Sequence, residues 1–173
     1  GTVTTAESSA KADIGISNGK IVAIGVGLPK GVEEIDATGL LVMPGMIDVH
    51  THFDHMVDLV NARNADDYET GSRAAAAGGI TTIVNFAFQT KGHSLREAIE
   101  YELSRAEGNS IIDYGIHQCV TDPTVSGVFD EIPKLADEGF ASVKCFTTTN
   151  VYQLPDRDVL RLLEVARDNG LMV

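Results

Sequence analysis

Two histidines two positions apart are the residues whose types and spacing most clearly suggest chemistry. They are His50 and His52, at the end of the run Met43-Pro-Gly-Met-Ile-Asp-Val-His-Thr-His52. Positions two apart share one face of a β-strand, so an extended segment from Met46 to His52 places Asp48 and both imidazoles on the same side. Two imidazoles on one face can bind a metal ion, whereas imidazoles satisfied by water or a carbonyl are structural. The spacing indicates a metal site and leaves the structural alternative open.

A lysine in a second strand-like run is the next candidate. Lys144 is the only charged residue of the run from Ala141 to Phe146. A lysine there can extend to the rim of a sheet, pair with a carboxylate, or be held neutral so that its amine reacts. The residues alone leave these three alternatives open. His117, in another apolar run, is interpreted as a core histidine satisfied by hydrogen bonds, with a place in the site as the alternative.

Elements that alternate between strand and helix position these residues. Strands are predicted at 46–52, 80–87, 113–120 and 141–146, and helices at 66–77, 94–108, 127–138 and 156–169. Asp66 with Glu69, and Ser94 with Glu97, give capping-box signatures at the starts of the first two helices. The apolar run 171–173 opens a further strand. Such alternation predicts an α/β fold with a parallel sheet, either doubly wound or a (β/α)₈ barrel, and both bind ligands at the carboxyl ends of strands. His50, His52 and Lys144 all lie at such ends.

The residues before the first histidine motif follow a different pattern. Alternation in Ala12–Ser17 and Lys20–Gly25, with Asn18-Gly19 between them, predicts a β-hairpin with a type I′ turn. Residues 34–39 predict one more short strand and turn. A few antiparallel strands bury too little surface to form a core alone.

Composition narrows the class of protein. The 173 residues are 43% apolar and 22% charged, which is typical of a globular domain, and the net charge of −12 argues against nucleic acid and anionic membrane surfaces as partners. No apolar run approaches the ~20 residues that span a bilayer, and no signal pattern opens the chain, so we expect a cytoplasmic protein. Cys119 and Cys145 form no CxxC pair, which disfavours a disulfide framework or a thiolate zinc site. The chain starts at Gly1 and ends on an uncapped apolar run, which indicates two cut ends.

Four stretches together resemble the amidohydrolase superfamily, and within it the cyclic amidohydrolases (dihydropyrimidinase, hydantoinase and allantoinase). They are the hairpin of residues 12–25, the metal motif of residues 42–52, Ala76-Ala-Gly-Gly-Ile-Thr-Thr82 and Ser142-Val-Lys-Cys-Phe146. The resemblance implies the first half of a (β/α)₈ TIM-type barrel preceded by a few strands of a small β-sandwich. It divides the chain into a partial sandwich at 1–42 and, at 43–173, the first four βα units of a metal-dependent hydrolase barrel, where a complete barrel takes about 250 residues.

The resemblance also implies a site and a reaction. His50 and His52 would bind one divalent ion, and an N-carboxylated Lys144 would bridge it to a second about 3.5–4 Å away. Nitrogen and oxygen ligands suit Zn²⁺, with Mn²⁺ or Co²⁺ as possible substitutes. A metal-bridging hydroxide would open a cyclic amide or imide, a small-molecule substrate, to an N-carbamoyl acid. The full-length protein would be a homo-oligomer, commonly a tetramer in this family.

Three departures from the family pattern bear on the substrate and on completeness. Dihydropyrimidinases carry an oxyanion-stabilising tyrosine five residues after the lysine; that position is Thr149 here, and Tyr152 is a nearby substitute. Dihydroorotases have an arginine where this chain has Asp54, which disfavours that activity. The remaining ligands, two histidines and an aspartate that is also the general base, should lie beyond Val173, so the chain alone should be inactive. The alternatives are a non-catalytic dihydropyrimidinase-related scaffold and a half-barrel that pairs with itself.

Overall fold

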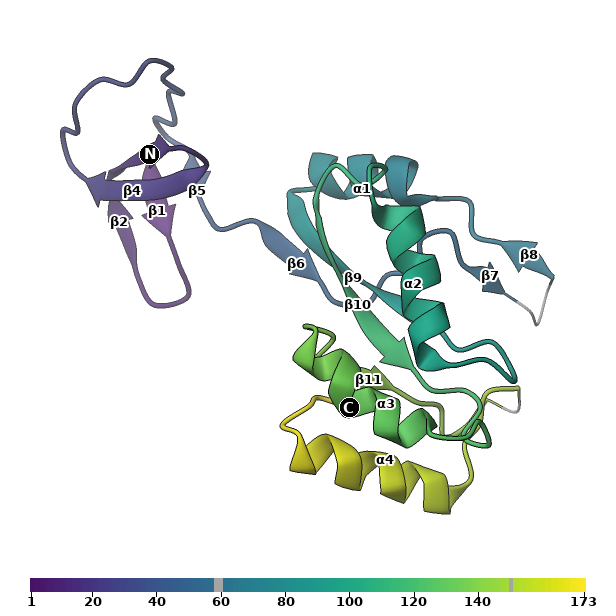
Figure 1. Ribbon diagram of the computed structural model, residues 1–173. Coiled ribbons are helices and arrows are strands. Elements are labelled where there is room, and N and C mark those ends of the chain that lie inside the picture. The colour runs from purple at the N-terminus through teal and green to yellow at the C-terminus, as the bar shows by residue number, and fades with distance from the viewer. Residues whose placement is uncertain (58–60, 150) are drawn as a thin grey trace. The chain divides into compact units, whose positions relative to one another are not determined.

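A computed structural model describes residues 1–57, 61–149 and 151–173 (Figure 1). The chain forms two compact units, Gly1–Gly45 and Met46–Val173. The division predicted after residue 42, into sandwich and barrel parts, stays a prediction.

The first unit consists of short strands. β1 (Thr2–Thr4) pairs antiparallel with β2 (Ser9–Lys11) and parallel with β5 (Leu41–Val42). β3 (Asp13–Ser17) and β4 (Lys20–Gly25) form the predicted hairpin, and positive φ angles of 51° at Asn18 and 71° at Gly19 make its turn. The hairpin prediction is therefore confirmed.

The strand predicted at residues 34–39 is wrong. This stretch has no regular strand, and the Asp36 carboxylate accepts a hydrogen bond of 2.9 Å from the Thr38 backbone N–H. Such a local side-chain bond competes with strand pairing.

The second unit is built on a parallel sheet. Its strands are β6 (Met46–Asp48), β9 (Ile80–Phe88), β10 (Asp113–Cys119) and β11 (Val143–Lys144), in the order β11-β10-β9-β6. The order of these four strands in the sheet follows their order along the chain, without a reversal. This is the arrangement of a barrel and not of a doubly wound sheet. Beyond β11, the Val143 N–H donates to the Met172 carbonyl over 2.8 Å, so residues 171–173 extend the sheet as expected.

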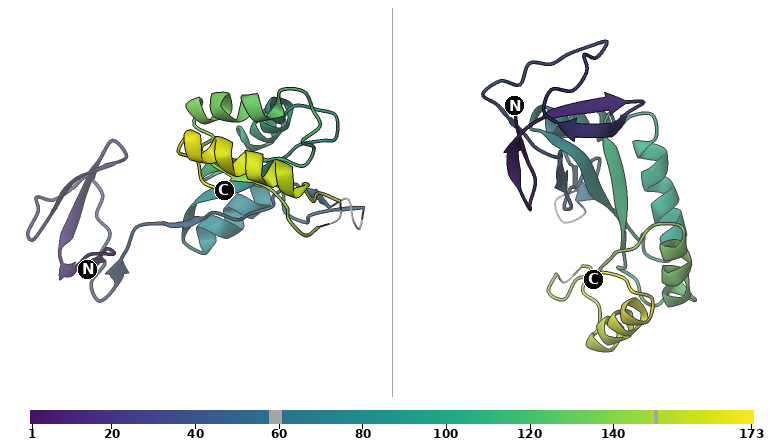
Figure 2. Two further views of the ribbon diagram at one scale, coloured as in Figure 1. Left: turned by 90° about the horizontal axis from the view of Figure 1, so that it is seen from below. Right: turned by 90° about the vertical axis from the view of Figure 1, so that its left-hand side faces the viewer.

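The helices are α1 (Tyr68–Ala77), α2 (Leu95–Ala106), α3 (Val128–Asp137) and α4 (Asp156–Asp168). Helix α2 lies along β9 and β10, as Figures 1 and 2 show, and α3 packs between α2 and α4. The Ser94–Glu97 capping box that predicted α2 is present. For α1 the predicted cap was one residue early, because Asp67 and Thr70 form the reciprocal bonds instead of Asp66 and Glu69.

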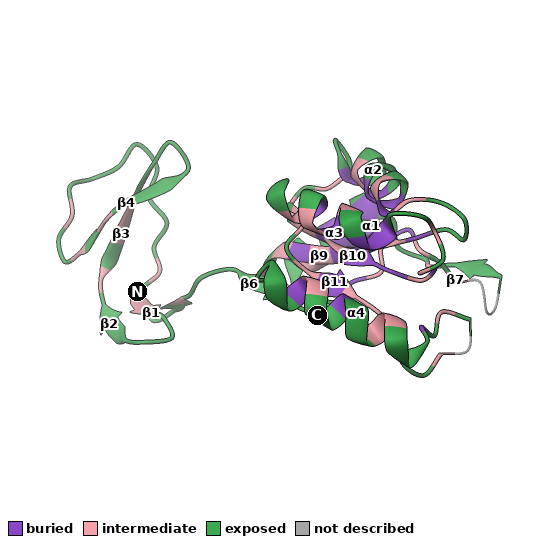
Figure 3. Ribbon diagram, turned by 60° about the horizontal axis from the view of Figure 1, so that its bottom comes forward, coloured by how far each residue is buried: buried purple, intermediate pink, exposed green. Residues whose placement is uncertain are grey.

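The main core lies between the sheet and these helices. Its fully buried members include Leu95, Ile132, Leu135 and Leu162, which pack with Ala87 and Val120 near the carboxyl ends of β9 and β10. Figure 3 shows buried residues on β9, β10 and the inner sides of the helices, while β4 is mostly exposed. Among the described residues no helix is long and apolar enough to cross a membrane.

Two features near the histidine motif differ from expectation. β6 ends at Asp48, so residues 49–52 are not the strand predicted from Met46 to His52. A short antiparallel pair that no pattern predicted, β7 (Met56–Val57) and β8 (Ala62–Arg63), follows the motif.

Candidate functional site

His50 and His52 lie just past the end of β6. The Asp48 carboxylate accepts a hydrogen bond of 3.0 Å from the His50 backbone N–H, which turns the chain out of the strand. The two imidazole centroids are nonetheless 5.3 Å apart. Asp48 thus takes a local structural role, and the histidines come together through a turn and not through the predicted strand face.

Phe86 of β9 is the common neighbour of the candidate residues. Its ring centroid lies 4.8 Å from that of His50 and 4.9 Å from that of His52. The Lys144 Nζ lies 5.6 Å from the same ring and 4.9 Å from the Phe146 ring. His50, Phe86 and Lys144 also line one cavity of about 180 Å³. The structure therefore brings the three predicted metal residues to one place, at the carboxyl end of the sheet.

His52 has the electrostatics of a neutral ligand. Burial, and after it the nearby His55, His50 and Lys144, together lower its pKa to about 4. Among the described residues, its Nδ1 is one of two buried side-chain N or O atoms with no hydrogen-bond partner. A neutral imidazole with an unsatisfied nitrogen is the form that binds a metal ion.

The donor set also shows what a metal would require. In the described parts of the chain no three His, Cys, Asp or Glu side chains are grouped to hold a metal ion. The two imidazoles therefore need a further donor to complete a metal site. Lys144 is the nearby candidate, through its amine or through an anionic oxygen group formed on it, so the residues fit a metal site in which Lys144 takes part.

Tyr152 and Thr149, the two candidate oxyanion residues, make different contacts near Lys144. The Tyr152 ring packs 5.4 Å from Phe146 and 5.7 Å from Phe88, centroid to centroid. Thr149 accepts a hydrogen bond of 2.9 Å from the Tyr152 backbone N–H through its carbonyl oxygen. The aromatic cluster thus links Tyr152 to Lys144, while Thr149 supports the turn that carries Tyr152.

A larger cavity of about 750 Å³ lies beside the histidines. Its lining includes His55, Arg63, Phe88, Tyr101 and Tyr152. This volume is in the range of small-molecule binding sites. His50 and Lys144 are not among its lining residues, so the larger cavity adjoins the candidate metal residues without containing them.

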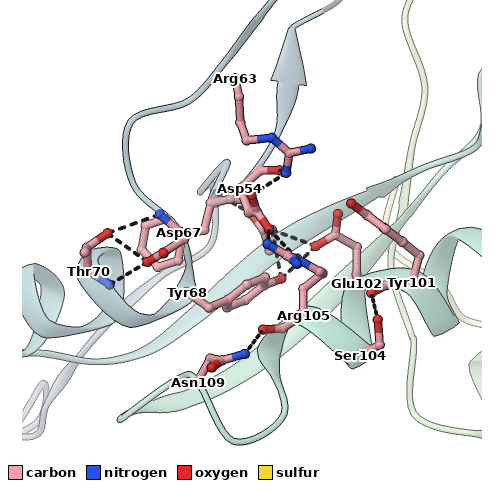
Figure 4. A network of polar contacts seen from close by, with 12 residues as sticks. Asp54, Arg63, Asp67, Tyr68, Thr70, Tyr101, Glu102, Ser104, Arg105 and Asn109 are labelled. Atoms are coloured by element: carbon pink, nitrogen blue, oxygen red, sulfur yellow. Dashed lines mark hydrogen bonds and ion pairs between the residues drawn. The ribbon is translucent and has the colours of Figure 1, made fainter.

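Two residues after His52, buried Asp54 forms ion pairs with Arg63 and Arg105 (Figure 4). Asp54 has a positive φ of 53°, a conformation that aspartate tolerates better than most residues. Its backbone N–H donates to the Asp66 carbonyl over 2.8 Å. Asp54 therefore anchors the chain two residues after His52 to β8 and α2, which explains why a carboxylate occupies this position.

Asn85 connects the same segment to the helices. Its amide oxygen accepts from the Phe53 N–H at 3.0 Å and from the Thr51 hydroxyl at 3.3 Å. Its amide nitrogen donates to Tyr68 at 2.9 Å and to Glu102 at 3.2 Å. Asn85 is 1% exposed. The residue therefore satisfies buried polar groups that flank His52 on both sides.

Sequence reasoning missed Phe86 and Asn85. Both lie in Ile80–Phe88, where successive side chains point to opposite faces. Phe86 faces the histidines and Asn85 the helices. An amide inside an otherwise apolar strand was the available signal for Asn85, because a buried amide requires partners.

Glu102 gives a prediction for pH dependence. Burial raises its pKa to about 7, although hydrogen bonds from Tyr68 and Asn85 oppose the shift. Between about pH 4.5 and 7 the folded state then holds a proton that the unfolded state has lost, so this group lowers stability as pH rises through that window. We expect Glu102→Gln to remove the loss, with a gain over wild type that grows by about 1–3 kcal/mol from pH 5 to pH 8.

The measurement is the urea unfolding midpoint of both proteins at each pH. Glu97→Gln, at the exposed start of α2, is the control for a carboxylate whose pKa is lowered and not raised. A gain for Glu102→Gln that is independent of pH would contradict the assignment.

A family profile, a curated relative and solved structures all match this chain. The profile of the Amidohydrolase family matches residues 41–173. The chain is 44% identical over 174 residues to the D-hydantoinase of Rhizobium radiobacter, with 100% of this chain and 37% of the relative covered. A solved D-hydantoinase structure superposes with a TM-score of 0.93 at 42% identity, covering 99% of this chain and 37% of the other. Dihydropyrimidinase from Brevibacillus agri gives a TM-score of 0.92 at 39% identity, with the same coverage. The chain thus spans 37% of the length of these relatives.

Proposed function

Because the chain belongs to the amidohydrolase family, we propose that it is the amino-terminal part of a metal-dependent hydrolase that opens a cyclic amide or imide ring. The family resemblance drawn from four sequence stretches is confirmed, and so is the α/β half-barrel fold class. The observation that carries the proposal is the gathering of His50, His52 and Lys144 around Phe86.

His50, His52 and Lys144 are the residues that would hold the metal. The Lys144 amine, once deprotonated, would attack carbon dioxide, form an N–C bond and lose a second proton, which leaves an anionic carbamate with two oxygen donors. In the unmodified state its ammonium group lies over two aromatic rings, a cation–π arrangement that keeps the side chain beside the histidines. When bound, two divalent ions, preferably Zn²⁺ for this donor set, would acidify a water and polarise the substrate carbonyl.

Tyr152 is the better placed of the two oxyanion candidates. Its ring belongs to the aromatic cluster beside Lys144 and lines the 750 Å³ cavity. Its phenol would donate a hydrogen bond to the oxygen on which charge develops as the ring opens. Thr149, which occupies the family position of the tyrosine, would support the Tyr152 turn through its carbonyl. The substrate is thus a small cyclic amide that enters through the larger cavity.

We further propose that the 173-residue chain does not hydrolyse substrate alone, because the family's remaining ligands and general base would come from the rest of the barrel. A cytoplasmic location and a tetrameric full-length protein stay predictions.

The test is metal content by plasma mass spectrometry, together with intact mass, on the full-length protein and on this chain. We expect about two divalent ions per full-length chain, the added mass of one carboxyl group, and weak loading of the 173-residue chain. Absence of metal from the full-length protein after growth and reconstitution with Zn²⁺ would contradict the proposal, and would favour the non-catalytic scaffold.

A further inference from the structure

His117 on β10 hydrogen-bonds to both of the segments that carry candidate metal residues. Its Nε2 lies 2.9 Å from the Val49 carbonyl oxygen, and its Nδ1 lies 2.6 Å from the Ser142 hydroxyl. Val49 immediately precedes His50, and Ser142 lies two residues before Lys144. The imidazole also packs 4.7 Å from the Phe86 ring, centroid to centroid. The side chain thus contacts β9 and reaches the segment after β6 as well as the residue just before β11.

The direction of these bonds follows from their partners. A carbonyl oxygen only accepts, so the His117 Nε2 carries the hydrogen that it donates to Val49. In the neutral ring Nδ1 then has a lone pair and accepts from the Ser142 hydroxyl. The order Ser142 to His117 to Val49 is therefore fixed for a neutral imidazole, and each of the two segments is held by one ring nitrogen.

Backbone pairing alone holds these segments weakly. β6 pairs with β9 over only three residues, with a register shift after Met46, and ends before His50. β11 has two residues. β9 and β10 separate β6 from β11 in the sheet, so no backbone ladder connects the two. His117 provides the side-chain connection that the ladders lack.

We propose that His117 is a positioning residue that sets the distance between the His50–His52 segment and Lys144. This inference rests on the proposed metal-dependent function. It assigns a role to a histidine that does not itself bind the metal. Of the two hydrogen bonds, the one from Nε2 to Val49 is the more important, because it holds the irregular segment.

Three substitutions separate the two bonds. His117→Gln places an amide nitrogen near the position of Nε2 and retains a donor for Val49. His117→Asn retains only the partner of Ser142, and His117→Phe keeps the volume and loses both bonds. His93→Gln is the matched control, since His93 is an exposed histidine that contacts Glu97 at the start of α2.

The experiment titrates Zn²⁺ and Co²⁺ into each metal-free full-length variant against a chromogenic chelator, and records the visible absorption spectrum of the Co²⁺-loaded protein. We expect His117→Phe to bind about tenfold more weakly than wild type, with an altered Co²⁺ spectrum. His117→Gln should restore most of the affinity, His117→Asn should not, and His93→Gln should match wild type.

The outcomes distinguish the inference from the function on which it rests. Wild-type affinity and spectrum in His117→Phe would overturn the positioning role and leave the proposed function intact. Failure of the wild-type protein to bind either ion would overturn the proposed function and this role with it. If His117→Phe does not fold, equal affinities for the Gln and Asn variants would overturn the role, and tighter binding by the Gln variant would support it.

Discussion

Lys144→Ala is expected to reduce the divalent metal bound by the full-length protein from about two ions per chain to one or fewer, and to lower hydrolysis of a cyclic amide by about a thousandfold or more. The physical reason is the donor set. His50 and His52 provide two imidazole nitrogens, and no third His, Cys, Asp or Glu joins them among the described residues. On the proposed assignment, removing the lysine would remove the anionic ligand that neutralises charge between the two ions.

The measurement combines metal content with the rate of ring opening of dihydrouracil and hydantoin. Lys134→Ala, an exposed lysine on α3, is the control for the loss of one positive charge. Lys144 lines the cavity of about 180 Å³, so its truncation to Ala should leave space that a small carboxylate can enter, and added propionate should restore part of the metal content and activity. Unchanged metal and activity in Lys144→Ala would exclude Lys144 as a ligand.

The sequence predicted those elements whose signals are local. The apolar, β-branched run of Ile80–Phe88 became β9, and the Ser94–Glu97 capping box opens α2. The end of β6 was not predictable from alternation, because the Asp48 carboxylate hydrogen-bonds to the His50 N–H and ends the strand early. The predicted strand and the observed turn both bring the two histidines to one side. The candidate site was therefore found although the strand prediction was wrong.

The candidate site likewise contains residues that local sequence patterns reveal and contacts that they do not reveal. His50, His52 and Lys144 were identified because their spacing and isolation are visible along the chain. His117 was interpreted as a satisfied core histidine, and its bonds to Val49 and Ser142 confirm that it is satisfied. That those partners belong to the segments carrying the metal candidates depends on strand order. Contacts of this kind join residues far apart in sequence, so no local pattern contains them.

Asn85→Leu is expected to destabilise the domain that carries β6, β9 and β10 by about 4 kcal/mol, since several buried groups lose their partners together. The Phe53 N–H loses its acceptor, and the Thr51 hydroxyl keeps only the Val84 carbonyl. Glu102 loses a donor and retains Tyr68. Leucine fills a similar volume, so the loss reports unsatisfied hydrogen bonds and not a cavity.

Urea unfolding measures this loss, and Asn109→Leu, at an exposed asparagine after α2, is the matched control with a change near zero. Asn85→Asp sharpens the test. It keeps an acceptor for Phe53 and Thr51 but places a second carboxylate against Glu102, whose burial already raises its pKa to about 7. The aspartate variant should therefore be near wild type at pH 5, where a protonated Glu102 can donate to it, and much weaker at pH 8, where both groups would be charged. Stability of Asn85→Leu close to that of wild type, or an aspartate variant insensitive to pH, would show that the segment flanking His52 is held by other contacts.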